Sequence, residues 1–180
     1  MTVIPRLTTA RLRLRPFDMT DADRVHELLA VPDIADTTLN IPYPYPEGAA
    51  AAWITGHAQA AREGTSWTWA ITRHQDDLLL GAIGMGVVMA HRRGTLGYWL
   101  GVPFWGQGYT SEAVRHAVAF GFEDLGLHRI DAECMSRNPA SAKVMQRAGM
   151  VHEGTFRDYI IKNDSFESID RYAVIRDAAP

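Results

Sequence analysis

The chain has 180 residues, of which 47% are hydrophobic and 22% are charged, and its formal net charge is -3. This balance is typical of an ordinary globular protein, and the absence of a basic run argues against general binding to nucleic acid or to an anionic membrane surface. Cys134 is the only cysteine, which excludes an internal disulfide and disfavours a cysteine-based metal site. We therefore expect no metal, no nucleic acid and no membrane among its partners.

Neither targeting nor domain division is evident in the sequence. Residues 1–6 lack an apolar core of signal-peptide length, and no run approaches the length that spans a membrane. No repeat, linker or low-complexity tract interrupts the chain. We expect a cytoplasmic protein with one domain over residues 1–180, long enough to bury a sizeable core.

The first half of the chain alternates between strand and helix patterns. Arginine and leucine alternate over residues 11–15 and Phe17 follows, which predicts a half-buried strand. Residues 20–30 predict a helix with Thr20 as its N-cap. Four prolines in residues 31–46 predict extended chain or loop, and alanine-rich residues 47–63 predict a second helix. Strands are expected next at residues 66–72, 78–88 and 95–100.

The second half continues with two helices and three strands. Apolar residues at helical spacing predict a helix over residues 111–125. Asn138 is a good N-cap, Pro139 suits the first helical position and Gly149 is placed to end the fourth helix. The remaining strands are expected at residues 129–135, 151–161 and 167–175. This order favours a mixed sheet that is covered by helices on its faces.

The most informative stretch is residues 97–113, where an apolar strand enters a glycine-bearing turn that opens onto a helix. Gly106 and Gly108 permit a tight turn whose backbone N–H groups converge, with the positive end of the helix dipole behind them. Such a turn binds a phosphate or pyrophosphate. A simple structural connection between strand and helix is the alternative reading of the same glycines.

Two well-known phosphate motifs do not fit this turn. Gly101 and Gly106 have the spacing of a P-loop, but Gln107 follows where that motif needs lysine. A dinucleotide-binding turn needs a third glycine at position 111, which is Ser111, and an early βαβ unit.

The motifs in order resemble those of one family. Residues 97–100 (Gly-Tyr-Trp-Leu), 105–113 (Trp-Gly-Gln-Gly-Tyr-Thr-Ser-Glu-Ala), 138–141 (Asn-Pro-Ala-Ser) and 148–150 (Ala-Gly-Met) together resemble the GNAT superfamily of N-acetyltransferases. Within it, the chain is most similar to the branch of ribosomal-protein acetyltransferases (RimJ/RimL-like). The resemblance implies an α/β fold with a mostly antiparallel sheet of six to seven strands, a V-shaped splay between two parallel strands and about four helices.

The resemblance also implies the activity and its site: transfer of an acetyl group from acetyl-CoA to a primary amine. Backbone groups of Leu100, Gly101 and Val102 would pair with the pantetheine arm. The pyrophosphate would be held by the amides of Gln107, Gly108, Tyr109, Thr110 and Ser111. Asn138 would bond the pantetheine, and Ser141 would protonate the leaving thiolate, although a plain N-cap and a first-turn residue are the alternatives for these two.

A general base is not evident at either position where the family usually places a glutamate. The strand at residues 94–100 has no carboxylate, and Ile160 stands at the second position. Asp158, Tyr159, His91 and Asp36 are candidate substitutes. For Glu112, the acid that follows the turn, we favour a role in complementing the helix N-terminus.

The acceptor side is defined less sharply. Residues 36–45, with tyrosines between prolines, predict either one wall of the acceptor cleft or a loop that packs on the core, whereas Trp67 and Trp69 are expected in the core. A protein N-terminus and a small-molecule amine both remain open as acceptors. A non-catalytic acyl-CoA-binding module is the alternative function, and the resemblance also implies that the chain can form a homodimer.

Overall fold

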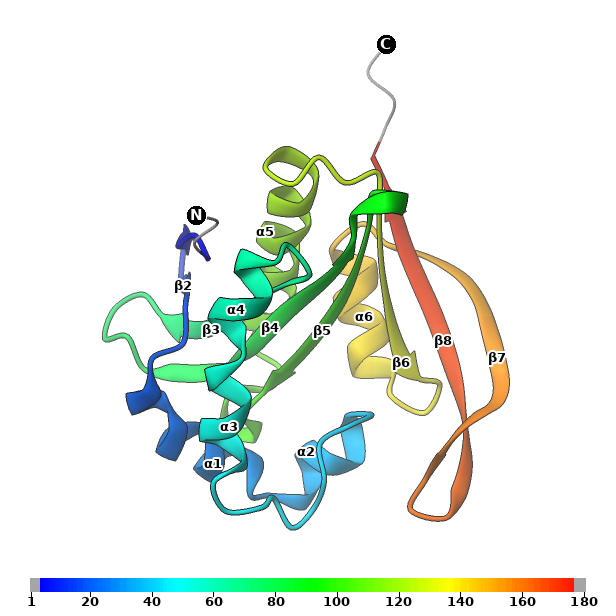
Figure 1. The fold of residues 1–180 in the computed structure, drawn as a ribbon. Coiled ribbons are helices and arrows are strands. Elements are labelled where there is room, and N and C mark those ends of the chain that lie inside the picture. The colour runs from blue at the N-terminus through cyan, green and yellow to red at the C-terminus, as the bar shows by residue number, and fades with distance from the viewer. Residues whose placement is uncertain (1–3, 177–180) are drawn as a thin grey trace.

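Eight strands form one continuous sheet in the computed structural model of the chain, which describes residues 4–176. Residues 1–3 of the N-terminal stretch considered above lie outside the described residues. The strand order is β1-β2-β3-β4-β5-β6-β8-β7, and each neighbouring pair is antiparallel except β5 and β6 (Figure 1). The strands are β1 (Leu7–Thr8), β2 (Leu12–Arg15), β3 (Ser66–Arg73), β4 (Leu79–Val88), β5 (Arg93–Leu100), β6 (Arg129–Met135), β7 (Val151–Lys162) and β8 (Ser165–Ile175).

Helices cover both faces of this sheet, as expected for a mixed sheet. The α-helices are α1 (Ala22–Leu29), α2 (Pro32–Thr37), α3 (Ala49–Thr55), α4 (His57–Arg62), α5 (Tyr109–Glu123) and α6 (Pro139–Arg147). Helices α5 and α6 contribute to one buried apolar cluster, and α1, α2 and α3 contribute to a second cluster on the opposite face (Figure 1). No helix within residues 4–176 is long and apolar enough to cross a membrane.

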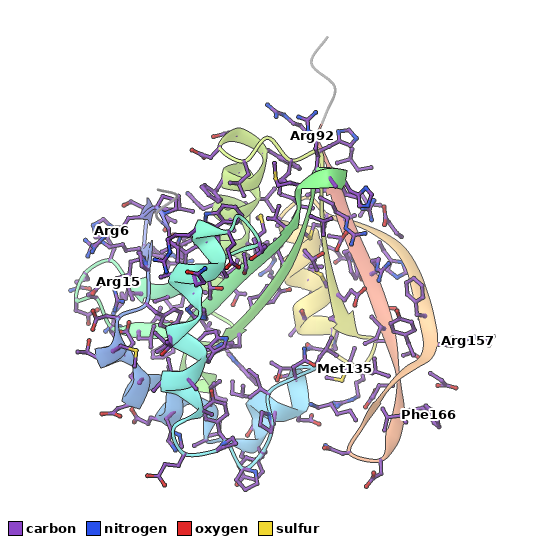
Figure 2. All side chains as sticks on the ribbon, viewed as in Figure 1. Arg6, Arg15, Arg92, Met135, Arg157 and Phe166 are labelled. Atoms are coloured by element: carbon purple, nitrogen blue, oxygen red, sulfur yellow. The ribbon has the colours of Figure 1, made fainter. Side chains whose placement is uncertain are left out.

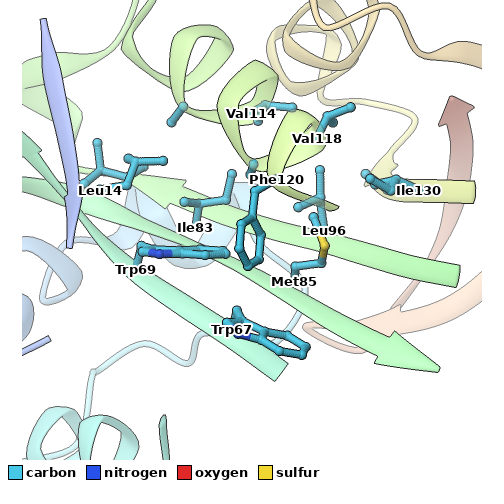
Figure 3. Close-up of a cluster of buried hydrophobic side chains, with 14 of the residues drawn as sticks. Leu14, Trp67, Trp69, Ile83, Met85, Leu96, Val114, Val118, Phe120 and Ile130 are labelled. Atoms are coloured by element: carbon cyan, nitrogen blue, oxygen red, sulfur yellow. The ribbon is translucent and has the colours of Figure 1, made fainter. Parts of the chain in front are cut away.

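Helix α5 packs on the centre of the sheet. Trp67 and Trp69 lie two positions apart on β3, so their side chains point to the same side of the sheet, toward Phe120 of α5 (Figure 3). The rings of Trp69 and Phe120 meet edge to face with centroids 5.2 Å apart. Both tryptophans are buried, which confirms their prediction as core residues. Burial of such large rings is a main source of the hydrophobic stabilisation that holds α5 against the sheet, here through its C-terminal half.

The N-terminal helix begins differently from the prediction. Asp18, not Thr20, is the capping residue: its side chain accepts a hydrogen bond from the Thr20 backbone N–H at 2.9 Å. The cap starts a 3₁₀ turn over Met19–Asp21, and α1 begins only at Ala22. Aspartate is as good an N-cap as threonine, so the residue types alone do not predict whether Asp18 or Thr20 caps the helix.

Three further predictions need correction. Residues 31–46 are not all extended or looped, because Pro32 occupies the first turn of α2, where a missing N–H costs nothing. The helix predicted for residues 47–63 is two helices that meet at Gly56, since glycine weakens the helix interior. The sheet has eight strands where six to seven were expected, and the short β1 was not predicted.

The second half follows its prediction closely and contains the feature that positions the site. Strand β6 has the predicted bounds, and the Asn138 side chain caps α6. Strands β5 and β6 pair in parallel from Arg93↔Arg129 to Leu96↔Ala132, and the register ends there. Beyond this point the two strands diverge, which confirms the V-shaped splay (Figure 1).

Candidate functional site

Two cavities open where β5 and β6 diverge. The first, here called the loop cavity, has a volume of about 350 Å³ and lies between the turn at residues 106–111, the end of β5 and helix α6. The second, the strand cavity, has a volume of about 470 Å³ and lies between the diverging halves of β5 and β6, β4 and residues 37–41. Both volumes are in the range of small-molecule sites.

The turn at one end of the loop cavity has the geometry predicted for an anion site. Gly106 and Gly108 adopt φ values of +73° and +81°, which residues with a side chain rarely adopt. Gly108 is the N-cap of α5 and has no side chain to satisfy the first N–H groups of the helix. Tyr109, Thr110 and Ser111 line the cavity directly after it. The first turn of α5 is therefore available to bind a negatively charged group.

A buried carboxylate anchors this turn to the N-terminal segment. Glu112 accepts hydrogen bonds from the Thr9 hydroxyl at 2.5 Å and from the Arg11 backbone N–H and Nε at 2.9 and 2.7 Å. Burial opposes ionisation, but these hydrogen bonds hold the pKa of Glu112 below its ordinary value. Arg11 in turn donates from Nη1 to the Gln107 carbonyl at 2.9 Å and lies over the Tyr109 ring. Glu112 thus fixes the loop in place, a more specific role than complementing the helix dipole.

Two cations from α6 also line the loop cavity. Lys143 and Arg147 lie four residues apart, so they share one face of the helix. They are the charged residues among the described residues that line this cavity. The sequence analysis missed them, although their spacing after the Asn138 cap was a usable signal.

The two cavities meet at Tyr98, Trp99, Ser141 and the segment that follows α2. These residues, together with Thr37 and Thr38, line both cavities. The Tyr98 hydroxyl lies 2.9 Å from the Ser141 hydroxyl, and either oxygen can be the donor. Burial raises the pKa of Tyr98 well above its ordinary value, so its hydroxyl keeps its proton. The sequence predicted Ser141 but not Tyr98, which lies 43 residues away and reaches Ser141 only through the fold.

Asn138 has two structural partners. Its Oδ1 accepts from the Ser141 backbone N–H at 3.0 Å, as an N-cap does, and its Nδ2 donates to the Thr37 carbonyl at 3.1 Å. Arg137 strengthens the same connection, since its guanidinium donates to the Asp36 carboxylate at 2.9 Å. The end of α2 is therefore tied across the opening of the V. One hydrogen of the Asn138 amide remains for another partner.

The segment at the end of β5 is only partly free to bind. Leu100 lines the loop cavity, and its carbonyl accepts a 2.6 Å hydrogen bond from the Trp105 indole. The Gly101 N–H donates to the Leu80 carbonyl at 2.8 Å. Val102 begins a 3₁₀ turn. Of the three residues expected to pair with pantetheine, Leu100 therefore has the clearest access to the cavity.

The strand cavity has one charged residue among the described residues that line it, Glu133 of β6. Arg171, opposite it on β8, donates from Nε to Glu133 Oε1 at 2.7 Å. The candidates named from sequence, Asp158, Tyr159, His91 and Asp36, are not among the described residues that line either cavity. The sequence analysis missed Glu133, because a glutamate on an alternating strand has no distinctive pattern.

Residues 36–45, with tyrosines between prolines, partly form a cavity wall and partly pack on the core, the two roles predicted for them. Leu39, Asn40 and Ile41 line the strand cavity, as a cleft wall would. Tyr45 instead packs against the apolar cluster beneath α1 and α3. Met135, at the end of β6, lies near α2 and also lines the strand cavity (Figure 2).

Cys134, the neighbour of Glu133, also lines the strand cavity. Burial raises the pKa of its thiol to about 11, and a hydrogen bond from Ser141 opposes the shift only in part. The thiol is therefore protonated near neutral pH, whereas a nucleophilic cysteine needs the thiolate. This disfavours a mechanism in which Cys134 is acylated first.

Comparisons with known proteins agree with this geometry. A family model described as "Acetyltransferase (GNAT) domain" matches residues 11–151. The chain is 27% identical over 175 residues to the uncharacterized N-acetyltransferase YoaA of Bacillus subtilis, covering 97% of this chain and 98% of YoaA. It is 29% identical over 105 residues to the ribosomal-protein-serine acetyltransferase of Escherichia coli, covering 58% and 59% of the two chains.

Solved structures show the same fold. The ribosomal L7/L12 α-N-protein acetyltransferase RimL, solved in complex with coenzyme A, superimposes with a TM-score of 0.87 at 21% identity, covering 98% of this chain and 99% of RimL. At this identity the likeness establishes the fold. The family match, which spans residues 11–151, shows in addition that the chain belongs to the GNAT family of acetyl-CoA-dependent N-acetyltransferases.

Proposed function

We propose that this N-acetyltransferase binds acetyl-CoA in the loop cavity and a primary amine in the strand cavity, and that transfer takes place where the cavities meet. One observation carries this proposal: two cavities of opposite charge meet at the Tyr98–Ser141 hydroxyl pair. The cationic side suits the phosphates of coenzyme A. The anionic side suits an acceptor amine, which is cationic in water at neutral pH.

On the donor side, the first turn of α5 would hold the pyrophosphate through the N–H groups of residues 107–111. The positive φ of Gly108 and the absence of a capping side chain support this assignment. Lys143 and Arg147 would add charge-assisted contacts to the phosphates of coenzyme A. The pantetheine arm would pass Leu100 and reach the free amide hydrogen of Asn138, both of which line the loop cavity.

At the junction, Ser141 would give a proton to the departing thiolate. The 2.9 Å contact lets the Tyr98 hydroxyl return a proton to Ser141, and water then reprotonates Tyr98, whose pKa burial raises above its ordinary value. The protonated Cys134 supports direct transfer from acetyl-CoA to the amine, without an acyl-cysteine intermediate.

For the acceptor we favour a protein N-terminal α-amine over a small-molecule amine. Support comes from the E. coli relative, which is named as a ribosomal-protein-serine acetyltransferase. We also propose that residues 1–180 form a single domain that acts in the cytoplasm. A homodimer is supported by the exposed edge strand β7, because Val151 and Ile161 are 69% and 66% exposed. Light scattering that shows only a monomer in solution would contradict the proposed homodimer.

The first test is calorimetric titration with acetyl-CoA, with NADH as the comparison ligand. We expect micromolar binding of acetyl-CoA and no binding of NADH. Release of free coenzyme A is then followed with peptides that begin with Ser, Ala or Met and with the small amines spermidine and ethanolamine. Transfer to the peptides supports the proposal, and transfer to the small amines alone reassigns the acceptor. Tight acetyl-CoA binding without transfer to any of these amines would favour the non-catalytic binding module.

A further inference from the structure

Glu133 occupies a special position in the sheet. The last parallel pair between β5 and β6 is Leu96↔Ala132, so Glu133 is the first residue of β6 after the strands part. On β5 the residue at the same level is Gly97, and a Cβ built on Gly97 has no atom within 4 Å. The carboxylate therefore stands at the narrow end of the V, next to open space.

Among the described residues that line the strand cavity, no second charged side chain competes with this carboxylate for a cation. The cavity's other described lining residues are apolar, small or neutral polar, and Glu133 is the charged one among them. Nearby Asp131 does not line the cavity, and it accepts a hydrogen bond from the Thr95 hydroxyl at 2.8 Å. An ammonium group that leaves water for such a space needs a counter-charge.

The contacts of Glu133 leave one oxygen for a ligand. Two nitrogens of the Arg171 guanidinium, Nε and Nη2, contact the same oxygen, Oε1. No hydrogen bond within residues 4–176 reaches Oε2, and the side chain is 23% exposed. Arg171 is held in turn against the Phe156 ring, with its Cζ 4.8 Å from the ring centroid. The ion pair fixes the orientation of the carboxylate, and the second oxygen retains its lone pairs.

From this arrangement we propose that Glu133 is the residue that binds the acceptor ammonium and removes its proton. The proposal rests on the proposed function, because it assigns the strand cavity to the amine. Glu133 Oε2 takes one proton from the ammonium and leaves a neutral amine with a free lone pair. The amine nitrogen then forms a bond to the thioester carbonyl carbon as the carbon–sulfur bond breaks. Glu133 has by then passed the first proton to water, so Oε2 takes the second proton from the acylated nitrogen and releases it to water in turn. Ser141 gives its proton to the sulfur and regains one through the Tyr98 hydroxyl, which water reprotonates, so the reaction releases one proton overall.

The test uses the full chain and the variants Glu133→Gln and Glu133→Asp. At pH 7 we expect E133Q to lower kcat/KM for the best amine of the panel by about 100-fold, since general base catalysis is typically worth 10²–10⁴-fold. Acetyl-CoA affinity should stay within about twofold, because Glu133 does not line the loop cavity. We expect the deficit to shrink as pH rises through the pKa of the amine, because free amine then needs no base. E133D should show an intermediate loss.

Glu153→Gln is the matched control. Glu153 forms an exposed ion pair with Arg129, so its loss removes a comparable carboxylate–arginine contact away from both cavities. We expect wild-type kcat/KM and an unchanged pH profile for E153Q. A deficit of E133Q that is constant from pH 7 to pH 10 would assign Glu133 a structural role and overturn the proposal.

A second readout does not depend on turnover. With coenzyme A bound at saturation, the wild type should bind n-butylamine more tightly than the neutral 1-butanol, and E133Q should lose this preference. Thermal unfolding reports whether E133Q is folded, and E133D takes its place if it is not. Wild-type activity of E133Q overturns the role of Glu133 and leaves the proposed function standing. Failure of the wild type to bind acetyl-CoA overturns both.

Discussion

The loop cavity and the strand cavity are built on the two sides of one strand divergence, yet they differ in how they acquire polarity. The loop cavity obtains its positive character from the backbone N–H groups at the start of α5 and from Lys143 and Arg147 on α6. The strand cavity obtains its negative character from one side chain, Glu133. A backbone site tolerates many side chains but not a change in backbone conformation. A single-carboxylate site has the opposite sensitivity, so the two cavities should respond to different kinds of substitution.

The sharpest way to break the loop cavity is a change in backbone conformation. We expect Gly108→Val to weaken acetyl-CoA binding by at least about 1,000-fold, because a φ of +81° is rarely adopted by a branched residue. Loss of two charge-assisted hydrogen bonds at roughly 2 kcal/mol each would account for this factor. Calorimetry gives the affinity.

Gly64→Val is the control for this substitution, because Gly64 has a φ of +71° and lies outside both cavities. It carries a similar backbone strain, on the order of 1–3 kcal/mol, without touching the turn. Equal loss of acetyl-CoA affinity in both variants would mean that the effect is general destabilisation. Unchanged affinity in G108V would remove the turn from the donor site.

The junction between the cavities should affect turnover rather than binding. We expect Ser141→Ala to lower kcat by about 100-fold with acetyl-CoA affinity within about threefold, because the proton donor acts only as the sulfur departs. Tyr98→Phe should lower kcat by a smaller factor, since the Ser141 hydroxyl can still donate its own proton to the sulfur. Ser136→Ala is the control, as its hydroxyl contacts Asp170 and lines neither cavity. Unaltered turnover in S141A would mean that Ser141 has only a structural role in the first turn of α6.

The charges on α6 should have a moderate effect on the donor side alone. We expect Lys143→Gln with Arg147→Gln to weaken acetyl-CoA binding by about tenfold, because both side chains are exposed and partly screened by solvent. The loss should diminish at high salt, and the KM for the amine should not change. Arg115→Gln, an exposed cation on α5, is the control. A tenfold rise in the KM of the amine would contradict the assignment of the two cavities.

The difference between the cavities also explains what the sequence could predict. The turn at Gly108 and the cap at Asn138 are local, because the residues that determine each lie within a few positions of one another. The family motifs also led to Ser141. Tyr98 and Glu133 are different, because each becomes significant only when the β5–β6 register ends after Leu96. That register depends on packing between distant segments, and no spacing in the sequence encodes it.

The same reasoning applies to the fold. Strand β6 and the end of α6 at Gly149 were predictable from local signals, since alternation and a positive φ of +83° act at short range. Helix α2 was not, because the prolines of residues 31–46 suggested loop, while Pro32 in fact begins a helix. The ties from Arg137 and Asn138 to the end of this helix come from another part of the chain.

The smallest predicted effect concerns acid stability on the acceptor side. Burial lowers the pKa of His57 to about 4, and its ring packs against Phe17 and against Trp53, which lines the strand cavity. The folded chain keeps this histidine neutral, whereas the unfolded chain protonates it near pH 6.5. Its contribution to stability is therefore complete above about pH 6.5 and is lost as the pH falls toward 4.

We expect the melting temperature of the wild type to fall over this interval by a few degrees more than that of His57→Phe, which cannot take up a proton. His74→Phe, on an exposed turn, should behave like the wild type. Parallel melting curves for the wild type and H57F between pH 6.5 and 4 would show that solvent reaches the ring freely. If the difference is found, acid should loosen the wall that Trp53 gives to the strand cavity before it affects the loop cavity. Amine affinity would then weaken at a higher pH than acetyl-CoA affinity, and titrations of the two ligands across the same interval would measure this separation.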